Sequence, residues 1–153
     1  MLGRKRKKAV KSTHKIIDKS NKNNHVDYQE VYRNIRTNIE YSAVGKNVKA
    51  INITSPISNE GKSTTALNLA MIYATKYANV LLIDADLRRP TQHQYLELSN
   101  ARGLTNALIE YGETKKISSK YFQFIEDESF EGKLSVLTTG VRVPNPSELI
   151  SSD

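Results

Sequence analysis

The stretch EGKST at 60–64 decides the fold expected for this chain of 153 residues. It lies between a short β-rich run at 48–54 (VKAINIT) and a long apolar stretch at 63–78 (STTALNLAMIYATKYA). A phosphate chain needs a turn whose backbone N–H groups, with a helix N-terminus, face its anionic oxygens. Lys62 can reach the β- and γ-phosphates, and the Ser63 hydroxyl can bind Mg²⁺. The segment therefore predicts a strand, a phosphate-binding loop and a helix packed on more than one side.

A second motif, DADLRRP at 84–90, ends the continuous apolar run NVLLID at 79–84. Such a run is typical of a strand buried on both faces, and two strands joined by a helix imply a right-handed parallel βαβ unit. The carboxyl ends of parallel strands meet at one sheet edge, so we expect Asp84 and Asp86 near the phosphate loop. Two carboxylates would repel a triphosphate unless Mg²⁺, shared with Ser63, lay between them.

The remaining pattern completes an α/β chain. Asp27 and Glu30 have the spacing of a capping box before a helix predicted at 28–44, with Gly45 as its C-terminal cap. The other elements expected are helices near 91–98 and 103–111, a short element at 121–125, a strand at 134–138 and a helix beginning at Asn145-Pro146. The expected fold class is an α/β three-layer fold with a mainly parallel sheet.

Positive charge is concentrated in the first residues. Residues 1–22 hold nine Lys/Arg and one Asp, a charge of +8, whereas residues 23–153 carry −1. We interpret 1–26 as a basic flexible arm, which is either a solvated tail or, through 4–22, a contact for anionic lipid. Nucleic acid ranks last, because no aromatics are interleaved among residues 1–13. The absence of Cys excludes disulfides and thiolate metal sites.

The two motifs together resemble the deviant Walker A and Walker A′ pair of the bacterial tyrosine kinases, P-loop NTPase-like enzymes that regulate capsule and exopolysaccharide synthesis. EVYRNIRTNI at 30–39 is similar to the family's E-x-x-R-x-x-R oligomerisation helix. RGLTNAL at 102–108 and the stretch 134–153 resemble further family segments. The resemblance covers 27–153, which we interpret as a partial P-loop kinase domain with an oligomerisation helix and a βαβ core.

The resemblance implies an ATP-dependent protein-tyrosine (auto)kinase that uses Mg²⁺. The nucleotide-binding positions expected are Ser58, Asn59, Glu60, Gly61, Lys62, Ser63 and Thr64. The catalytic positions are Lys62, Asp84 and Asp86, and the metal positions are Ser63, Asp84 and Asp86. The oligomerisation positions are Glu30, Arg33 and Arg36, which would pair between protomers; without the resemblance, both arginines read as solvated helix positions.

Several departures from the family keep alternatives open. Pro56 replaces the first Gly of the P-loop pattern, and Ser58-Asn59 stand where the family commonly has Pro-Gly. Asn tolerates left-handed backbone angles, so we expect the loop to form. The family's Walker B strand and tyrosine cluster would follow Asp153, so we expect a fold incomplete at its C-terminus, with an apolar sheet edge exposed beside the phosphate-loop strand.

Two rival functions follow from these departures. One is a non-kinase, nucleotide-dependent assembly ATPase of the partition or division-site type, although Ile57 replaces the signature Lys of those proteins. The other is an inactive truncated remnant. For the kinase, the expected partners are a membrane-spanning activator or polysaccharide co-polymerase, tyrosine substrates including the kinase itself, and further copies of the chain. The expected location is the cytoplasm, at the inner face of the cell membrane.

Overall fold

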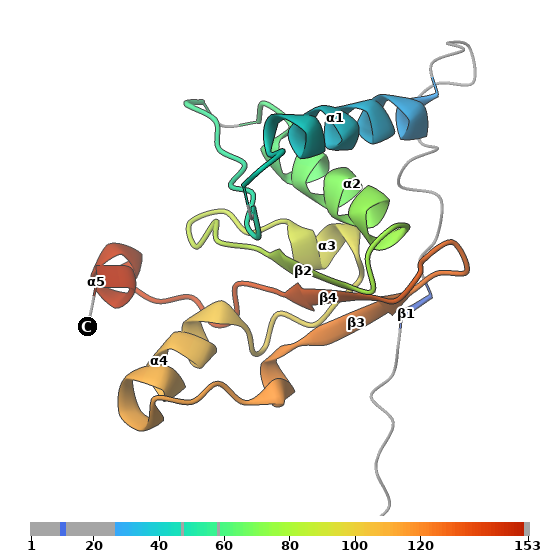
Figure 1. The fold of residues 1–153 in the computed structure, drawn as a ribbon. Coiled ribbons are helices and arrows are strands. Elements are labelled where there is room, and N and C mark those ends of the chain that lie inside the picture. The colour runs from blue at the N-terminus through green and yellow to red at the C-terminus, as the bar shows by residue number, and fades with distance from the viewer. Residues whose placement is uncertain (1–9, 12–26, 47, 58, 152–153) are drawn as a thin grey trace, which may run out of the picture.

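A mixed four-stranded sheet forms the centre of the molecule (Figure 1). The computed structural model describes residues 10–11, 27–46, 48–57 and 59–151. The strands are β1 (Val10–Lys11), β2 (Asn79–Ile83), β3 (Gln123–Glu126) and β4 (Lys133–Leu137), in the order β1-β3-β4-β2. The pairs β1–β3 and β2–β4 are parallel, and β3–β4 is antiparallel. Parallel pairing is thus present as expected, within a mixed sheet.

Helices cover both faces of the sheet and give three layers (Figure 1). On one side lie α1 (Tyr28–Ser42), α2 (Lys62–Ala74) and the short α3 (Gln92–Tyr95). On the other lies α4 (Leu104–Thr114), beside the 3₁₀ helix η2 (Ser119–Tyr121), and α5 (Pro146–Ser151) follows near the end of the chain. The expected helices are all present, with ends that differ by a few residues, and the element expected at 121–125 is η2 followed by β3.

The helix α2 is the centre of the core, as its apolar surface predicted. It contacts α1 on one side and the strands β2 and β4 on the other. Leu67 and Ala74 are fully buried, as are Leu134 and Val136 of β4. Burial of a side chain of this size contributes about 1.5–3 kcal/mol, so this helix–sheet contact is a main source of stability. It also fixes the first residue of α2, Lys62, relative to the end of β2.

The predicted strand at 48–54 is not formed, which is a correction to the sequence analysis. Residues 48–54 have no strand pairing, and Val48 and Ile51 are largely exposed. A groove of about 1130 Å³ lies between this segment and β2. Sheet hydrogen bonds require strands about 4.8 Å apart, and across this groove the segment forms no pairing with β2. The βαβ unit expected from 48–54, the helix and β2 is therefore not closed in the described residues.

The strand β2 is buried on one face only, contrary to the prediction from its apolar run. Leu82 lies in the core under α2, whereas Leu81 and Ile83 are each about half exposed (47% and 48%). In the described part of the chain, β2 ends the strand order and pairs only with β4. Its outer edge therefore lines the groove; this is not the edge anticipated from the sequence, which was to lie beside the phosphate-loop strand, because 48–54 forms no strand.

A second departure concerns the arm. Val10 and Lys11, within the segment interpreted as flexible, pair with Ile125 and Glu126 of β3. This two-residue strand extends the sheet at the edge opposite to β2. The rest of the arm, and so most of the basic residues of 4–22, lies outside the described residues.

The helix α1 is held to α2 by charged side chains. Asp27 caps α1 as predicted, accepting hydrogen bonds from the backbone N–H groups of Gln29 and Glu30. Glu40 lies 2.6 Å from the Lys76 ammonium and accepts a 3.0 Å hydrogen bond from the Tyr77 hydroxyl. The hydrogen bond from Lys76 is the main cause that holds the pKa of Glu40 below its usual range, against the effect of burial. An ionised Glu40 therefore ties α1 to the turn that follows α2 more strongly than a protonated one.

This link makes an acid-sensitive contribution to stability. Because the pKa of Glu40 is lower in the folded than in the unfolded chain, its contribution is present above about pH 4.3 and is lost as the pH falls further. We expect Glu40→Gln to lower the melting temperature at pH 7 and to reduce its decrease between pH 5 and pH 3. Glu113→Gln, an exposed position on α4, is the control. If the melting temperature of Glu40→Gln fell as much between pH 5 and pH 3 as that of the wild type, Glu40 would not be the source of the acid-sensitive stability.

Candidate nucleotide-binding site

The loop before α2 has the backbone shape that anion binding needs. Asn59 and Gly61 both take positive φ angles, +68° and +79°. Asn is among the few residues that adopt this region readily, so the predicted tolerance of Asn59 is confirmed, and Gly61 adopts it without a steric cost. Gly61 is the N-cap of α2, so the free N–H groups of the first helical turn face the same space as the loop. This geometry suits an anionic ligand.

The loop and the acidic turn meet through one ion pair. Lys62 Nζ lies 3.0 Å from Asp86 Oδ2, and both side chains are about three-tenths exposed (33% and 26%). Although partial burial opposes it, the backbone N–H of Arg89 and the Lys62 ammonium hold the pKa of Asp86 below its usual range. The structure thus brings together two residues that are 24 positions apart in the sequence.

Asp84 has a different environment from Asp86. It is 5% exposed, and its two oxygens accept hydrogen bonds from the backbone N–H groups of Asp86 (3.1 Å) and Gln92 (3.2 Å). Burial raises the pKa of Asp84 above its usual range, and these N–H groups oppose the rise only in part. A buried carboxylate with neutral partners is stabilised by a nearby cation, so Asp84 fits the edge of a divalent metal site.

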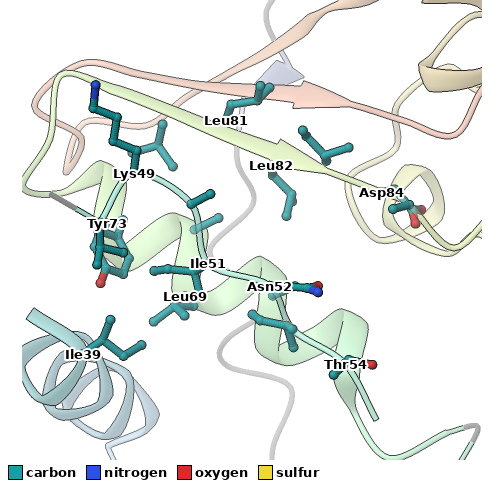
Figure 2. Close-up of a pocket in the computed structure, with 18 of the residues that line it drawn as sticks. Ile39, Lys49, Ile51, Asn52, Thr54, Leu69, Tyr73, Leu81, Leu82 and Asp84 are labelled. Atoms are coloured by element: carbon teal, nitrogen blue, oxygen red, sulfur yellow. The ribbon is translucent and has the colours of Figure 1, made fainter. Parts of the chain in front are cut away.

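The groove beside β2 leads to these residues. Lys62, Ser63, Asp84 and Asp86 all line it at one end. Figure 2 shows Asp84 beyond the end of β2 and Thr54 at the nearer end of the 48–54 segment, whereas Leu69 of α2 lies beside Ile51, farther along the groove. The apolar length of the groove continues between Ile51 and the half-exposed edge of β2. Polar groups thus converge at one end of a mainly apolar cleft, as is common in small-molecule sites.

The other residues expected at the site have mixed placements. Asn59, Glu60, Gly61 and Thr64 are exposed on the loop and the first turn of α2, whereas Ser58 lies outside the described residues. In α1, Glu30 and Arg33 are exposed. Arg36 instead points inward, and its Nη1 donates a 2.9 Å hydrogen bond to the Ile72 carbonyl of α2. Within this chain, Arg36 therefore anchors its own helix.

Gln92 is a site residue that the sequence analysis missed. It is 3% exposed, and its side chain donates a 2.8 Å hydrogen bond to the carbonyl of Ser63. Its backbone N–H binds Asp84. The signal that could have identified Gln92 is its position. It is a polar residue two places after Pro90, at the start of a short helix that follows the acidic turn.

The ion pair predicts a measurable change in the titration of Asp86. We expect Lys62→Met to raise the pKa of Asp86, because the substitution removes the ammonium but keeps most of the side-chain volume. The measurement is a ¹³C NMR titration of the Asp86 carboxyl carbon, with Lys116→Met, an exposed position just beyond α4, as the control. An unchanged Asp86 titration in Lys62→Met would show that the two groups do not interact in solution.

Comparison with known proteins identifies relatives of this site. The model of the CobQ/CobB/MinD/ParA nucleotide binding domain (CbiA) matches residues 51–127, which is half of the chain. Tyrosine-protein kinase YwqD of Bacillus subtilis (strain 168) is 50% identical over 123 residues, which cover 80% of this chain and 48% of the relative. Tyrosine-protein kinase etk of Escherichia coli (strain K12) is 32% identical over 124 residues, covering 81% of this chain and 16% of the relative.

Solved structures agree with these sequence matches. The kinase domain of Escherichia coli tyrosine kinase ETK matches with a TM-score of 0.69 and 26% identity, over 93% of this chain and 58% of that one. The chimerical protein CapA2B2 matches with a TM-score of 0.63 and 33% identity, over 94% of this chain and 59% of that one. The chain spans about half the length, or less, of the curated relatives cited above.

Among the described residues, no helix combines the length and apolar character needed to cross a bilayer. The loop geometry, the ion pair and the family match all fall within one nucleotide-binding region. This chain therefore belongs to the family of CobQ/CobB/MinD/ParA nucleotide-binding domains, and its homologues include the bacterial tyrosine kinases.

Proposed function

We propose that this chain provides the ATP-binding part of a bacterial protein-tyrosine kinase that phosphorylates itself and other proteins and regulates capsular or extracellular polysaccharide synthesis. The observation that carries the proposal is the 3.0 Å contact between Lys62 and Asp86, which joins the phosphate loop to the acidic turn. The relatives named tyrosine-protein kinases support the reaction class.

Phosphoryl transfer requires little covalent chemistry from the protein, so positioning and charge neutralisation supply most of the rate. In the proposed site, the backbone N–H groups of residues 59–64 hold the phosphates; Ser58, also expected to bind them, lies outside the described residues. Lys62 leaves Asp86 and neutralises negative charge on the transferred group. The ammonium is already at the site before nucleotide binds, which reduces the reorganisation that binding requires.

The side chains at the head of the groove fit Mg²⁺. The Ser63 hydroxyl and the carboxylates of Asp84 and Asp86 are oxygen ligands, which this hard cation prefers, and the two carboxylates lie in one short turn. When bound, Mg²⁺ neutralises charge on the β- and γ-phosphates. Ser63 and Asp86 would hold it directly or through water, and Asp84 would act from the buried side.

Asp84 is also our proposed base for the tyrosine acceptor. Burial raises the pKa of Asp84, which favours proton uptake by the carboxylate where no metal ion neutralises its charge. Both oxygens already accept a backbone N–H, which fixes the orientation of the carboxyl group. Each oxygen of Asp84 has a second lone pair that can accept a hydrogen bond from the hydroxyl of an acceptor tyrosine. That hydroxyl would enter from the groove, which Asp84 lines.

The helix α1 is the proposed contact between protomers. Glu30 and Arg33 are exposed on it and can pair with another copy of the chain. Because Arg36 binds the Ile72 carbonyl, its contribution to assembly is to hold α1 in place on α2. We further propose that the kinase works in the cytoplasm at the inner membrane face, beside a membrane-spanning activator, with residues 4–22 near anionic lipid.

Nucleotide binding can be tested by thermal unfolding of the chain. A ligand at 100 times its Kd stabilises the folded state by about 2.7 kcal/mol. For a chain of this size, we therefore expect MgATP to raise the melting temperature by roughly 5–10 °C. Lys62→Ala should abolish the rise, whereas Lys116→Ala, an exposed control, should keep it. The absence of any rise in the wild type would overturn the proposal in favour of an inactive remnant.

A separate assay distinguishes a kinase from an assembly ATPase. With γ-labelled ATP and a tyrosine-containing polymer, the full-length gene product should transfer label to tyrosine, and Lys62→Ala should not. ATP binding without transfer of label would favour the non-kinase assembly ATPase.

A further inference from the structure

Gln92 is the residue that touches both halves of the candidate site. Its Nε2 donates a 2.8 Å hydrogen bond to the carbonyl of Ser63, in the first turn of α2. Its backbone N–H donates to Asp84 Oδ2 at 3.2 Å. One residue of α3 thus connects the phosphate-loop helix to the acidic turn, in addition to the Lys62–Asp86 pair.

Packing alone does not account for Gln92. The side chain is 3% exposed, and its Oε1 is buried without a hydrogen-bond partner among the described residues. A buried amide that satisfies only its donor end is less stable than an apolar side chain of similar shape. Gln92 also lines the groove that reaches Ser63 and Asp84. Its position therefore suggests a role in arranging the site.

We propose that Gln92 is a positioning residue for the nucleotide site, which fixes Ser63 relative to Asp84 by binding both from the first residue of α3. The proposal rests on the proposed function, because it concerns two residues assigned there to the metal. Gln92 acts through Ser63 and Asp84, not on the nucleotide. With this connection intact, the Ser63 hydroxyl and the acid pair are held at one spacing before the metal and nucleotide bind. Without it, binding itself must order them.

The test removes one hydrogen bond and keeps the rest. Gln92→Met has a similar volume and retains the backbone N–H that binds Asp84, but it loses the donor to the Ser63 carbonyl. The matched control is Gln94→Met, an exposed position on the same short helix. The readout is the Mg²⁺ concentration that gives half of the ADP-induced rise in melting temperature. We expect Gln92→Met to raise this concentration on the order of fivefold, and Gln94→Met to leave it unchanged.

A second readout needs neither metal nor nucleotide. If Gln92 holds the first turn of α2, the amide hydrogens of residues 65–67, which form the first hydrogen bonds within the helix, should exchange several-fold faster in Gln92→Met than in the wild type. Gln94→Met should exchange as the wild type does. If Gln92→Met does not fold, Gln92→Asn serves as the second variant, since it keeps a neutral amide and the backbone N–H but is one methylene shorter, so it loses the 2.8 Å bond to the Ser63 carbonyl.

The outcomes separate this proposal from the one it rests on. An ADP-induced rise with the same Mg²⁺ dependence in the wild type and the Gln92 variant would overturn the role of Gln92 and leave the proposed function standing. No ADP-induced rise in the wild type at any Mg²⁺ concentration would overturn the proposed function, and this proposal with it. A shift of equal size in Gln94→Met would also overturn it, because the effect would then belong to the whole of α3.

Discussion

The contact between the Lys62 ammonium and the Asp86 carboxylate is the interaction on which the candidate site depends. It joins a loop and a turn whose positions are each set by burial elsewhere. The helix α2 places Lys62 because Leu67 and Ala74 pack against the sheet, and β2 places Asp86 because Leu82 lies under that helix. Partial burial makes the pair stronger than a surface ion pair and costs each group part of its hydration. A phosphate group would replace Asp86 as the partner of Lys62 without leaving the ammonium uncompensated.

The two acids illustrate how a short turn produces different chemistry from identical side chains. Asp86 has a cation and a backbone N–H as partners, so it stays ionised, whereas the burial of Asp84 favours its protonated form. Environments that push two carboxyl pKa values apart are typical of sites that move protons. Gln92 binds both Asp84 and Ser63. It therefore holds the two acids, with their different pKa values, next to the first turn of α2.

Local features were predictable from the sequence because the residues themselves determine them. The cap at Asp27, the left-handed Asn59 and the helical part of 63–78 all depend on neighbouring residues. The prediction of a strand at 48–54 was wrong. A strand also needs a partner at hydrogen-bonding distance, and a groove separates this segment from β2. The exposure of Leu81 and Ile83 follows from the same unpaired edge.

The contacts that side chains make with other helices and loops were the least predictable from the sequence. The motif at 30–36 could not show that Arg36 turns inward to Ile72, since that depends on how α1 lies on α2. Gln92 was missed for the same reason, because its partners are 29 and 8 residues away. The meeting of Lys62 with Asp86 was expected from two parallel strands that end at one edge and from the family resemblance. In the structure it occurs although 48–54, the first of those strands, has no pairing.

The most direct measurement is a crystal structure of the chain with Mg²⁺ and a non-hydrolysable ATP analogue. The account predicts that the Lys62 ammonium moves from Asp86 to the β- and γ-phosphates, and that Ser63 and the acid pair surround a single metal ion. A nucleotide bound elsewhere, with the Lys62–Asp86 contact intact and no metal near Ser63, would contradict it.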